Sequence, residues 1–124
     1  MFTQLVLLPT APTCQTNAVL IAFSVAPSGR DNPDASVHDA VARAVTIVRE
    51  SGLPHRTDAM FTTIEGDWDP CMEVVRQCSE AMLEFGTRAS LVLKADIRPG
   101  YTGELTGKLD RLNAALEDVK NSNK

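Results

Sequence analysis

One uninterrupted apolar segment, residues 18–26 (AVLIAFSVA), limits what this chain can fold into more than any other feature. Apolar side chains occupy nearly every position of the segment and not only alternate positions. Such a run is typical of a strand that is covered on both faces. We therefore expect a central strand in a sheet, with protein packed over each of its two faces.

Two segments have the apolar spacing of amphipathic helices. The first is expected to start after Ser36 as its N-cap and to end at Gly52. The second is expected to start with Asp69 as its N-cap and Pro70 as its first residue, and to end at Gly86. The two apolar stripes consist of Val37, Val41, Ala44, Val45 and Val48, and of Cys71, Val74, Val75, Cys78, Met82 and Phe85.

The remaining periodic segments predict three more strands and a last helix. Residues 55–66 are extended in character and are expected to form two strands joined by a tight turn. Residues 89–98 alternate, with one face for the helices and one polar face. A final helix is predicted from a narrow apolar seam at spacings of four and three, made of Leu105, Leu109, Leu112, Leu116 and Val119.

The order strand, helix, strand, strand, helix, strand, followed by a C-terminal helix, predicts an α+β, ferredoxin-like βαββαβ fold. Right-handed crossovers place both helices on one face of an antiparallel sheet with strand order 4-1-3-2. The apolar strand at residues 18–26 is then central. We expect one domain over residues 18–120, a loosely attached arm over residues 1–17 and a frayed tail over residues 121–124.

The sheet face opposite the helices is the open face. Strand alternation directs Thr62 toward the helices, and Thr63 and Glu65 toward the open face, where Glu65 is within reach of Lys94 or Arg98. The full predicted set is Phe61, Thr63, Glu65, Lys94, Asp96 and Arg98. A half-apolar face with scattered charges is seldom left bare. We therefore expect a second subunit to cover it, with the final helix helping to hold the assembly.

Charge and cysteine placement argue against several classes of protein. A net charge of −4 with interspersed charges argues against nucleic-acid binding. The apolar run at residues 5–8 is too short for a membrane span, and no Lys or Arg precedes it as in a secretory signal. Cys71 and Cys78 lie about 10 Å apart along one helix, beyond disulfide reach. Free thiols indicate a reducing compartment, the cytoplasm.

The sequence contains few of the patterns on which catalysis or metal binding depends. It has no Cys-x-x-Cys pair, and its two histidines, His38 and His55, are far apart in sequence, so we expect no metal site and no cofactor. It has no nucleophile–base pair at a recognisable spacing and no phosphate-binding glycine loop. Glu65 and Asp67 are a weak signal of acid–base chemistry. We therefore predict no catalytic residues.

Several motifs resemble those of the small YkoF-like thiamine-binding protein family. They are residues 23–29 (FSVAPSG), 50–53 (ESGL), 62–69 (TTIEGDWD) and 96–98 (DIR). The resemblance covers roughly residues 18–119, and the third motif is its most specific part. It implies a ferredoxin-like domain that forms dimers or tetramers through its sheets and binds thiamine or its hydroxymethylpyrimidine part. The loop at residues 30–34 is longer and more charged than is usual in the family.

The resemblance also implies a set of ligand-binding residues. A thiazolium cation is attracted to an aromatic face or a carboxylate, and an aminopyrimidine needs donors and acceptors beside an apolar slot. The predicted ligand-binding residues are Phe23, Ser24, Thr62, Thr63, Glu65 and Trp68. Structural roles compete with this interpretation: Trp68 packing at the start of a helix, Asp69 acting only as an N-cap, and Glu65 forming an interface ion pair.

Three functions follow in order of support from the sequence. The first is a non-catalytic binding protein for thiamine or hydroxymethylpyrimidine, acting as carrier, buffer or sensor. The second is a structural or regulatory oligomerisation module without a small ligand, because ferredoxin-like folds serve many functions. The third is an enzyme that uses Glu65 and Asp67.

Overall fold

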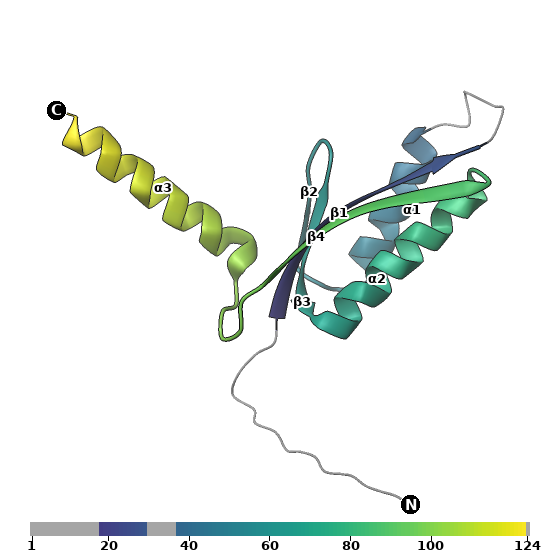
Figure 1. Ribbon diagram of the computed structural model, residues 1–124, viewed down its shortest axis with the longest axis horizontal. Helices are drawn as coiled ribbons and strands as arrows, with labels where there is room; N and C mark the ends of the chain where they lie inside the picture. The colour runs from purple at the N-terminus through teal and green to yellow at the C-terminus, as the bar shows by residue number, and fades with distance from the viewer. Residues whose placement is uncertain (1–17, 30–36, 124) are drawn as a thin grey trace, which may run out of the picture.

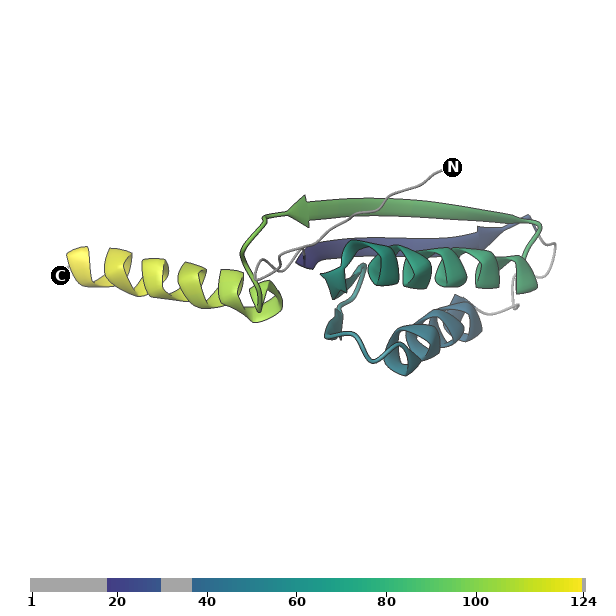
Figure 2. The ribbon, with the colours of Figure 1, turned by 90° about the horizontal axis from the view of Figure 1, so that it is seen from below.

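The structure is a computed structural model that describes residues 18–29 and 37–123. Four antiparallel strands form one sheet in the order β2-β3-β1-β4, and α1 and α2 lie on one face of it (Figures 1 and 2). The predicted ferredoxin-like α+β fold and strand order are confirmed. The elements are β1 (Ala18–Ser28), α1 (Val37–Glu50), β2 (His55–Thr57), β3 (Thr62–Asp67), α2 (Trp68–Ala81), the 3₁₀ helix η2 (Met82–Glu84), β4 (Arg88–Ile97) and α3 (Glu104–Ser122).

Strand β1 is central and pairs with β3 on one side and β4 on the other. Its residues Val19, Ile21 and Phe23 point to the helices and are buried. The alternate residues Leu20 and Ala22 lie on the open face and are half-buried. The unbroken apolar character of β1 is thus explained on the helix side, and the prediction that a second subunit covers the other face remains a prediction.

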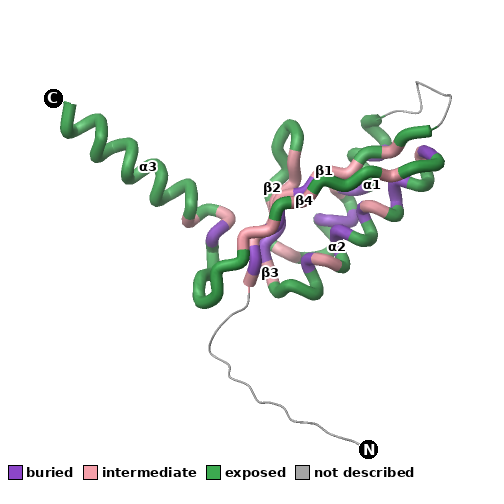
Figure 3. Tube along the Cα trace, in the orientation of Figure 1, coloured by how far each residue is buried: buried purple, intermediate pink, exposed green. Residues whose placement is uncertain are grey.

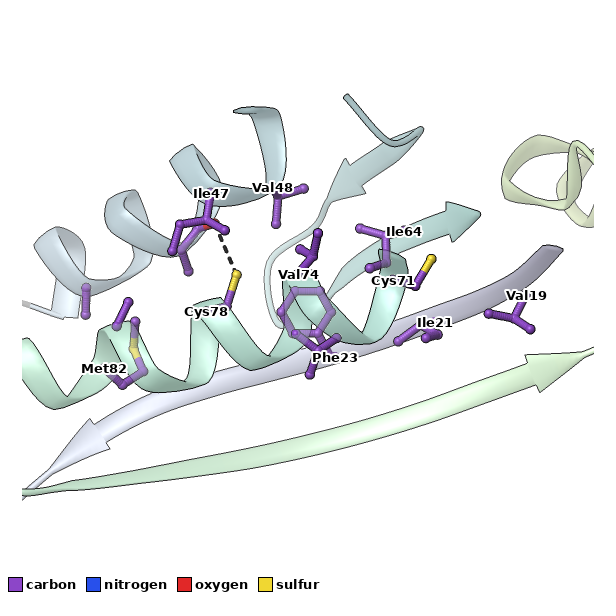
Figure 4. Packing of buried hydrophobic residues seen from close by; sticks show 14 residues of the cluster. Val19, Ile21, Phe23, Ile47, Val48, Ile64, Cys71, Val74, Cys78 and Met82 are labelled. Carbon is purple, nitrogen blue, oxygen red and sulfur yellow. Dashed lines mark hydrogen bonds between the residues drawn. The ribbon is translucent and has the colours of Figure 1, made fainter. Parts of the chain in front are cut away.

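The core lies between the sheet and the two helices (Figure 4). Cys71 and Cys78 are part of it as free, fully buried thiols, in the small-hydrophobe role expected from the sequence. Burial raises the pKa of both thiols to about 11, and for Cys71 the carboxylates of Asp67 and Glu65 act in the same direction. Cys78 Sγ also lies 3.5 Å from the Ala44 carbonyl oxygen, to which it donates.

The prediction that Asp69 caps α2 is wrong. Helix α2 begins at Trp68, and the preceding Asp67 has extended backbone but makes no side-chain capping bond. Strand β3 therefore runs into the helix without a loop, and Asp69 lies in the first turn. Pro70 is tolerated there because the first four N–H groups of a helix have no intrahelical acceptor.

Gly52 and Gly86 were both predicted to end a helix, and the structure confirms this role for Gly52 only. Gly52 follows α1 with φ of +75°, as a helix-terminating glycine should. Gly86, predicted to cap α2, does something else: α2 ends at Ala81 and η2 follows. Gly86 instead lies against β1, where an added Cβ would be 2.4 Å from the Ser28 carbonyl oxygen. The glycine is required by close backbone packing.

The edges of the fold depart from the expected boundaries. In β4, Leu93 and Ala95 pack on the core as predicted, whereas Leu91 and Ile97 are 43% and 60% exposed. Arg98 lies just beyond the strand.

Helix α3 includes residues 121 and 122, which were expected in the tail. The predicted arm over residues 1–17 and the predicted Ser36 cap lie outside the described residues.

Helix α3 leaves the body of the protein at one end of the sheet (Figures 1 and 2). Its first turn contacts β3, and most of its length is exposed (Figure 3). None of the helices in the described residues has the length and apolar character of a membrane span.

Replacing Gly86 with alanine is expected to destabilise the protein by about 2 kcal/mol, because the new methyl group would overlap the Ser28 backbone. Chemical denaturation would measure the loss. Ser90→Ala is the matched control, since Ser90 is exposed on β4 and its loss should change stability by less than about 0.5 kcal/mol. Equal stability of Gly86→Ala and the unmutated protein would contradict the packing assigned to Gly86.

Candidate functional site

The strand register gathers polar side chains on the open face. Leu20 of β1 stands opposite Glu65 of β3 and Asp96 of β4, so the two acidic residues flank an apolar one. One pair further along β1, Ala22 lies between Thr63 and Lys94. Since neighbouring strands are about 4.8 Å apart, residues on β3 and β4 lie roughly 10 Å apart across β1.

Ser24 continues this row opposite Val92. Ser24 and Thr63 are both partly exposed on the open face, as strand alternation predicts. Phe61 was expected in the same row, but it precedes β3 in the turn, where its carbonyl accepts a 2.9 Å hydrogen bond from the Asp58 N–H.

Glu65 holds the start of α3. Its Oε2 accepts a hydrogen bond from the Glu104 N–H at 2.9 Å, and its Oε1 accepts one from the Leu105 N–H at 3.1 Å. The side chain is only 7% exposed. The N-cap residue of α3 is Gly103, with φ of +68° and no side chain to offer an oxygen. The carboxylate thus satisfies first-turn N–H groups and is attracted to the positive end of the helix dipole.

This role differs from the expected contact of Glu65 with Lys94 or Arg98 across the open face of the sheet. Among the ion pairs formed by the described residues, none joins Glu65 to Lys94 or Arg98. The sequence separates Glu65 from its helix by 39 residues, so the contact is visible only once the strands are assembled.

Ion pairs surround this anchor. Arg111 donates a 2.7 Å hydrogen bond to Glu104 Oε2, and Arg98 lies 3.9 Å from Glu104 Oε1. The guanidinium of Arg98 also stacks over Tyr101, 3.6 Å from the ring centroid. On the exposed side, Lys108 of α3 donates to Asp96 of β4, which holds the pKa of that carboxyl below its usual range. The Lys108–Asp96 and Arg98–Glu104 pairs tie the first two turns of α3 to the end of the sheet, whereas the Arg111–Glu104 bond lies within the helix.

A groove of about 430 Å³ lies beside the anchor, between the start of β2 and the first turn of α3. Its volume is within the range of small-molecule sites. Apolar groups dominate its walls, and among the described residues that line it only Glu65 is charged. The described residues that line it are Ala18, Leu53, Pro54, Glu65, Gly66, Thr102, Gly103, Leu105 and Thr106.

A larger hollow of about 700 Å³ lies between the outer faces of α1 and α2. Its rim is dominated by exposed charges that neutralise one another: Arg76 pairs with Glu73 and Glu80. The bonds from Arg76 and Gln77 lower the pKa of Glu73 to about 2. None of the six predicted ligand-binding residues lines this hollow. The smaller groove is the better candidate because it combines apolar walls with a buried carboxylate.

The six predicted ligand-binding residues do not form one cluster. Phe23 is 2% exposed in the core, because it shares the helix-facing side of β1, and its ring is unavailable for stacking. Thr62 also lies on the helix side, with its Oγ1 3.3 Å from Thr57 Oγ1. Trp68 is 41% exposed at the start of α2. Of the six, only Glu65 lines the groove.

Sequence reasoning missed the contribution of residues 102–106. One signal was present: α3 starts after Gly103 without a Ser, Thr, Asp or Asn cap, so its N–H groups need acceptors from elsewhere in the fold. For metal binding, residues 18–29 and 37–123 contain no group of three His, Cys, Asp or Glu side chains placed to hold an ion.

Comparison with known proteins adds to this geometry. The profile of the family described as thiamine-binding protein matches residues 21–113. A UPF0045 protein of Mycobacterium bovis is 47% identical over 93 residues, which cover 74% of this chain and 88% of the relative.

Solved structures share the fold. A hypothetical protein of Methanocaldococcus jannascii is similar with a TM-score of 0.69 and 27% identity, over 78% of this chain and 97% of that one. A Thermotoga maritima protein, described in terms of thiamine biosynthesis or salvage, has a TM-score of 0.60 at 24% identity, over 73% and 96% of the two chains. At that identity the second likeness concerns the fold alone.

Replacing Glu65 with alanine should release the first turn of α3. Hydrogen bonds to a charged group contribute about 1.5–3 kcal/mol, so the Glu104 and Leu105 amides should exchange roughly 10- to 100-fold faster. Amide hydrogen exchange measures this directly. Thr63→Ala, on the same strand and face, is the control and should leave both rates unchanged. Unaltered exchange in Glu65→Ala would show that the carboxylate does not hold the helix.

Proposed function

This chain belongs to the thiamine-binding protein family, and we propose that it binds thiamine or its hydroxymethylpyrimidine part without transforming it. Its role would be that of a carrier, buffer or sensor. The observation that carries the proposal is a carboxylate, 7% exposed, in the wall of an apolar groove of about 430 Å³.

The groove offers the chemistry that such a ligand requires. Leu53, Pro54 and Leu105 supply apolar surface for a heterocyclic ring. Each oxygen of Glu65 accepts one backbone N–H and retains capacity for a second donor. An aminopyrimidine amino group can donate a hydrogen bond to that carboxylate, and such a charge-assisted bond is strong. A thiazolium cation has no N–H to donate and would instead be attracted by the negative charge.

The other predicted residues enter the proposal in different ways. Trp68, partly exposed and two residues beyond Gly66 of the groove, is an aromatic face available to stack on the ligand. Ser24 and Thr63 lie on the open face and not in the groove. They would approach a ligand only in an assembly that covers that face.

We propose such an assembly, a homodimer or homotetramer formed through the open face. The support is the uncovered apolar surface: Leu20 and Ala22 of β1 are half-buried and Val92 of β4 is 60% exposed. A sheet face that mixes apolar and polar side chains and is left uncovered is typical of an interaction surface. The same observation favours the second candidate function, an oligomerisation module without a small ligand.

Catalysis by Glu65 and Asp67 has less support. Glu65 is committed to the α3 anchor, and Asp67 is exposed and does not line the groove. For the compartment we propose the cytoplasm, because Cys71 and Cys78 are free thiols of the kind that a reducing environment preserves.

Calorimetric titration with thiamine and with hydroxymethylpyrimidine tests the proposal. We expect saturable binding of at least one, weakened at least roughly tenfold in Glu65→Gln because the charge is lost, which corresponds to about 1.4 kcal/mol. Trp68→Ala should weaken binding less than Glu65→Gln does, because stacking on the indole is expected to contribute less than the charge of the carboxylate. Arg76→Ala, in the hollow between α1 and α2, is the matched control and should bind like the unmutated protein.

Absence of heat and of a thermal shift with both ligands would contradict the proposal and favour the oligomerisation module. Recovery of chemically altered ligand after incubation would favour an enzyme. Hydrogen exchange on Glu65→Gln separates a lost ligand contact from a displaced α3, because only displacement speeds exchange at the Glu104 and Leu105 amides.

A further inference from the structure

Helix α3 begins in a way that is typical of a phosphate-binding site. Its N-cap residue, Gly103, has a φ of +68° and offers no side-chain acceptor, and an added Cβ there would meet nothing within 4 Å. The N–H groups of Glu104 and Leu105 donate to one acceptor group, at 2.9 and 3.1 Å. The anion at this helix end is the chain's own Glu65 carboxylate.

Glu65 fills the position that a bound anion would take. It is only 7% exposed, and each of its oxygens accepts one of the two N–H groups. A second anion would reach those N–H groups only by displacing a buried carboxylate. We infer that Glu65 occupies an anion site of α3 and thereby makes the neighbouring groove reject the phosphate esters of its ligand. The inference rests on the proposed function and names the class of ligand that the groove accepts, an unphosphorylated heterocycle.

The groove offers no basic side chain to receive a phosphate. Among the described residues that line it, none is a lysine or an arginine. Three cations near this end of the sheet are already paired with other carboxylates: Arg98 and Arg111 with Glu104, and Lys108 with Asp96. A phosphate in the groove would therefore lack the charged donor that usually binds it in proteins.

The negative charge of Glu65 remains available to act on a ligand. Glu65 takes part in none of the ion pairs formed within residues 18–29 and 37–123. The end of α3 offsets only part of that charge, since a helix N-terminus is equivalent to roughly half a positive charge. A thiazolium ring is cationic and an aminopyrimidine is a donor, whereas a phosphate ester adds about two negative charges at pH 7. The groove thus favours the first two groups and repels the third.

Two hydroxyl groups in the groove offer a competing interpretation. Thr102 and Thr106 line it, and each is able to donate a hydrogen bond to a phosphate oxygen. Hydroxyl donors carry no net charge, so they leave the repulsion between the phosphate and Glu65 in place. A phosphate ester that binds more tightly than its parent would show that these hydroxyls, and not Glu65, set the specificity.

Calorimetric titration of the full chain with thiamine and with hydroxymethylpyrimidine, each beside its phosphate ester, tests the inference. The ester should bind at least roughly tenfold more weakly than its parent, and thiamine diphosphate more weakly still. In Glu65→Gln, whose side chain is neutral, parent and ester should differ by less than about threefold. Arg76→Ala, in the hollow between α1 and α2, is the control and should keep the full difference.

Equal binding of ester and parent by the unmutated protein would overturn the inference, and so would a difference that persists in Glu65→Gln. The proposed function would survive either result, because the unphosphorylated ligand would still bind. If neither unphosphorylated ligand binds, the proposed function fails, and a measurement without an organic ligand decides the inference.

That measurement uses inorganic phosphate. Glu65→Ala frees the Glu104 and Leu105 N–H groups, which phosphate should then bind. Hydrogen exchange at both amides should slow roughly fivefold in the variant at a phosphate concentration about five times the dissociation constant. The unmutated protein should show no change, and sodium chloride at the same ionic strength is the control for salt.

Exchange in Glu65→Ala that does not respond to phosphate would overturn the inference, because the helix end would then not be an anion site. Circular dichroism confirms that the variant retains its fold. Glu65→Thr is the second variant: it also leaves the two N–H groups without the carboxylate, and threonine is well suited to a strand. It should respond to phosphate in the same way.

Discussion

The contact on which the rest of this structure depends is the one between the Glu65 carboxylate and the first-turn amides of α3. It joins the middle strand pair to the last helix, and it closes one wall of the groove. A buried carboxylate is costly unless its oxygens are satisfied, and helix N–H groups without acceptors are costly as well. The bonds between them remove the desolvation cost of the carboxylate and satisfy the helix N–H groups. This explains why the start of α3 is held against the sheet although the rest of the helix is exposed.

The fold was predictable because local patterns agreed with one another. The apolar run of β1, the two helical stripes and the alternation of β4 all indicated a sheet with helices on one face, and the strand order followed from handed crossovers. Boundaries were less predictable. Asp69 reads as a cap in sequence, but β3 continues into α2 without a loop, and Gly86 serves close packing on Ser28, a tertiary contact with no sequence signal.

The candidate site was only partly predictable. Alternation placed Ser24, Thr63 and Glu65 on the open face and Thr62 on the helix side, yet Phe23 was expected at a ligand and is in the core. The groove depends on residues 53–54 and 102–106 meeting Glu65, which no spacing in the sequence encodes. A ligand in this groove would contact the carboxylate that holds α3, so ligand binding is expected to stabilise the anchor.

The most direct test of this account is hydrogen exchange at the Glu104 and Leu105 amides with and without saturating thiamine. A ligand that contacts Glu65 in the groove stabilises the closed anchor, so exchange at both amides should slow by roughly 100-fold at a ligand concentration 100 times the dissociation constant. Unchanged exchange at both amides, while calorimetry shows bound thiamine, would place the ligand elsewhere and contradict the central role of the Glu65 anchor.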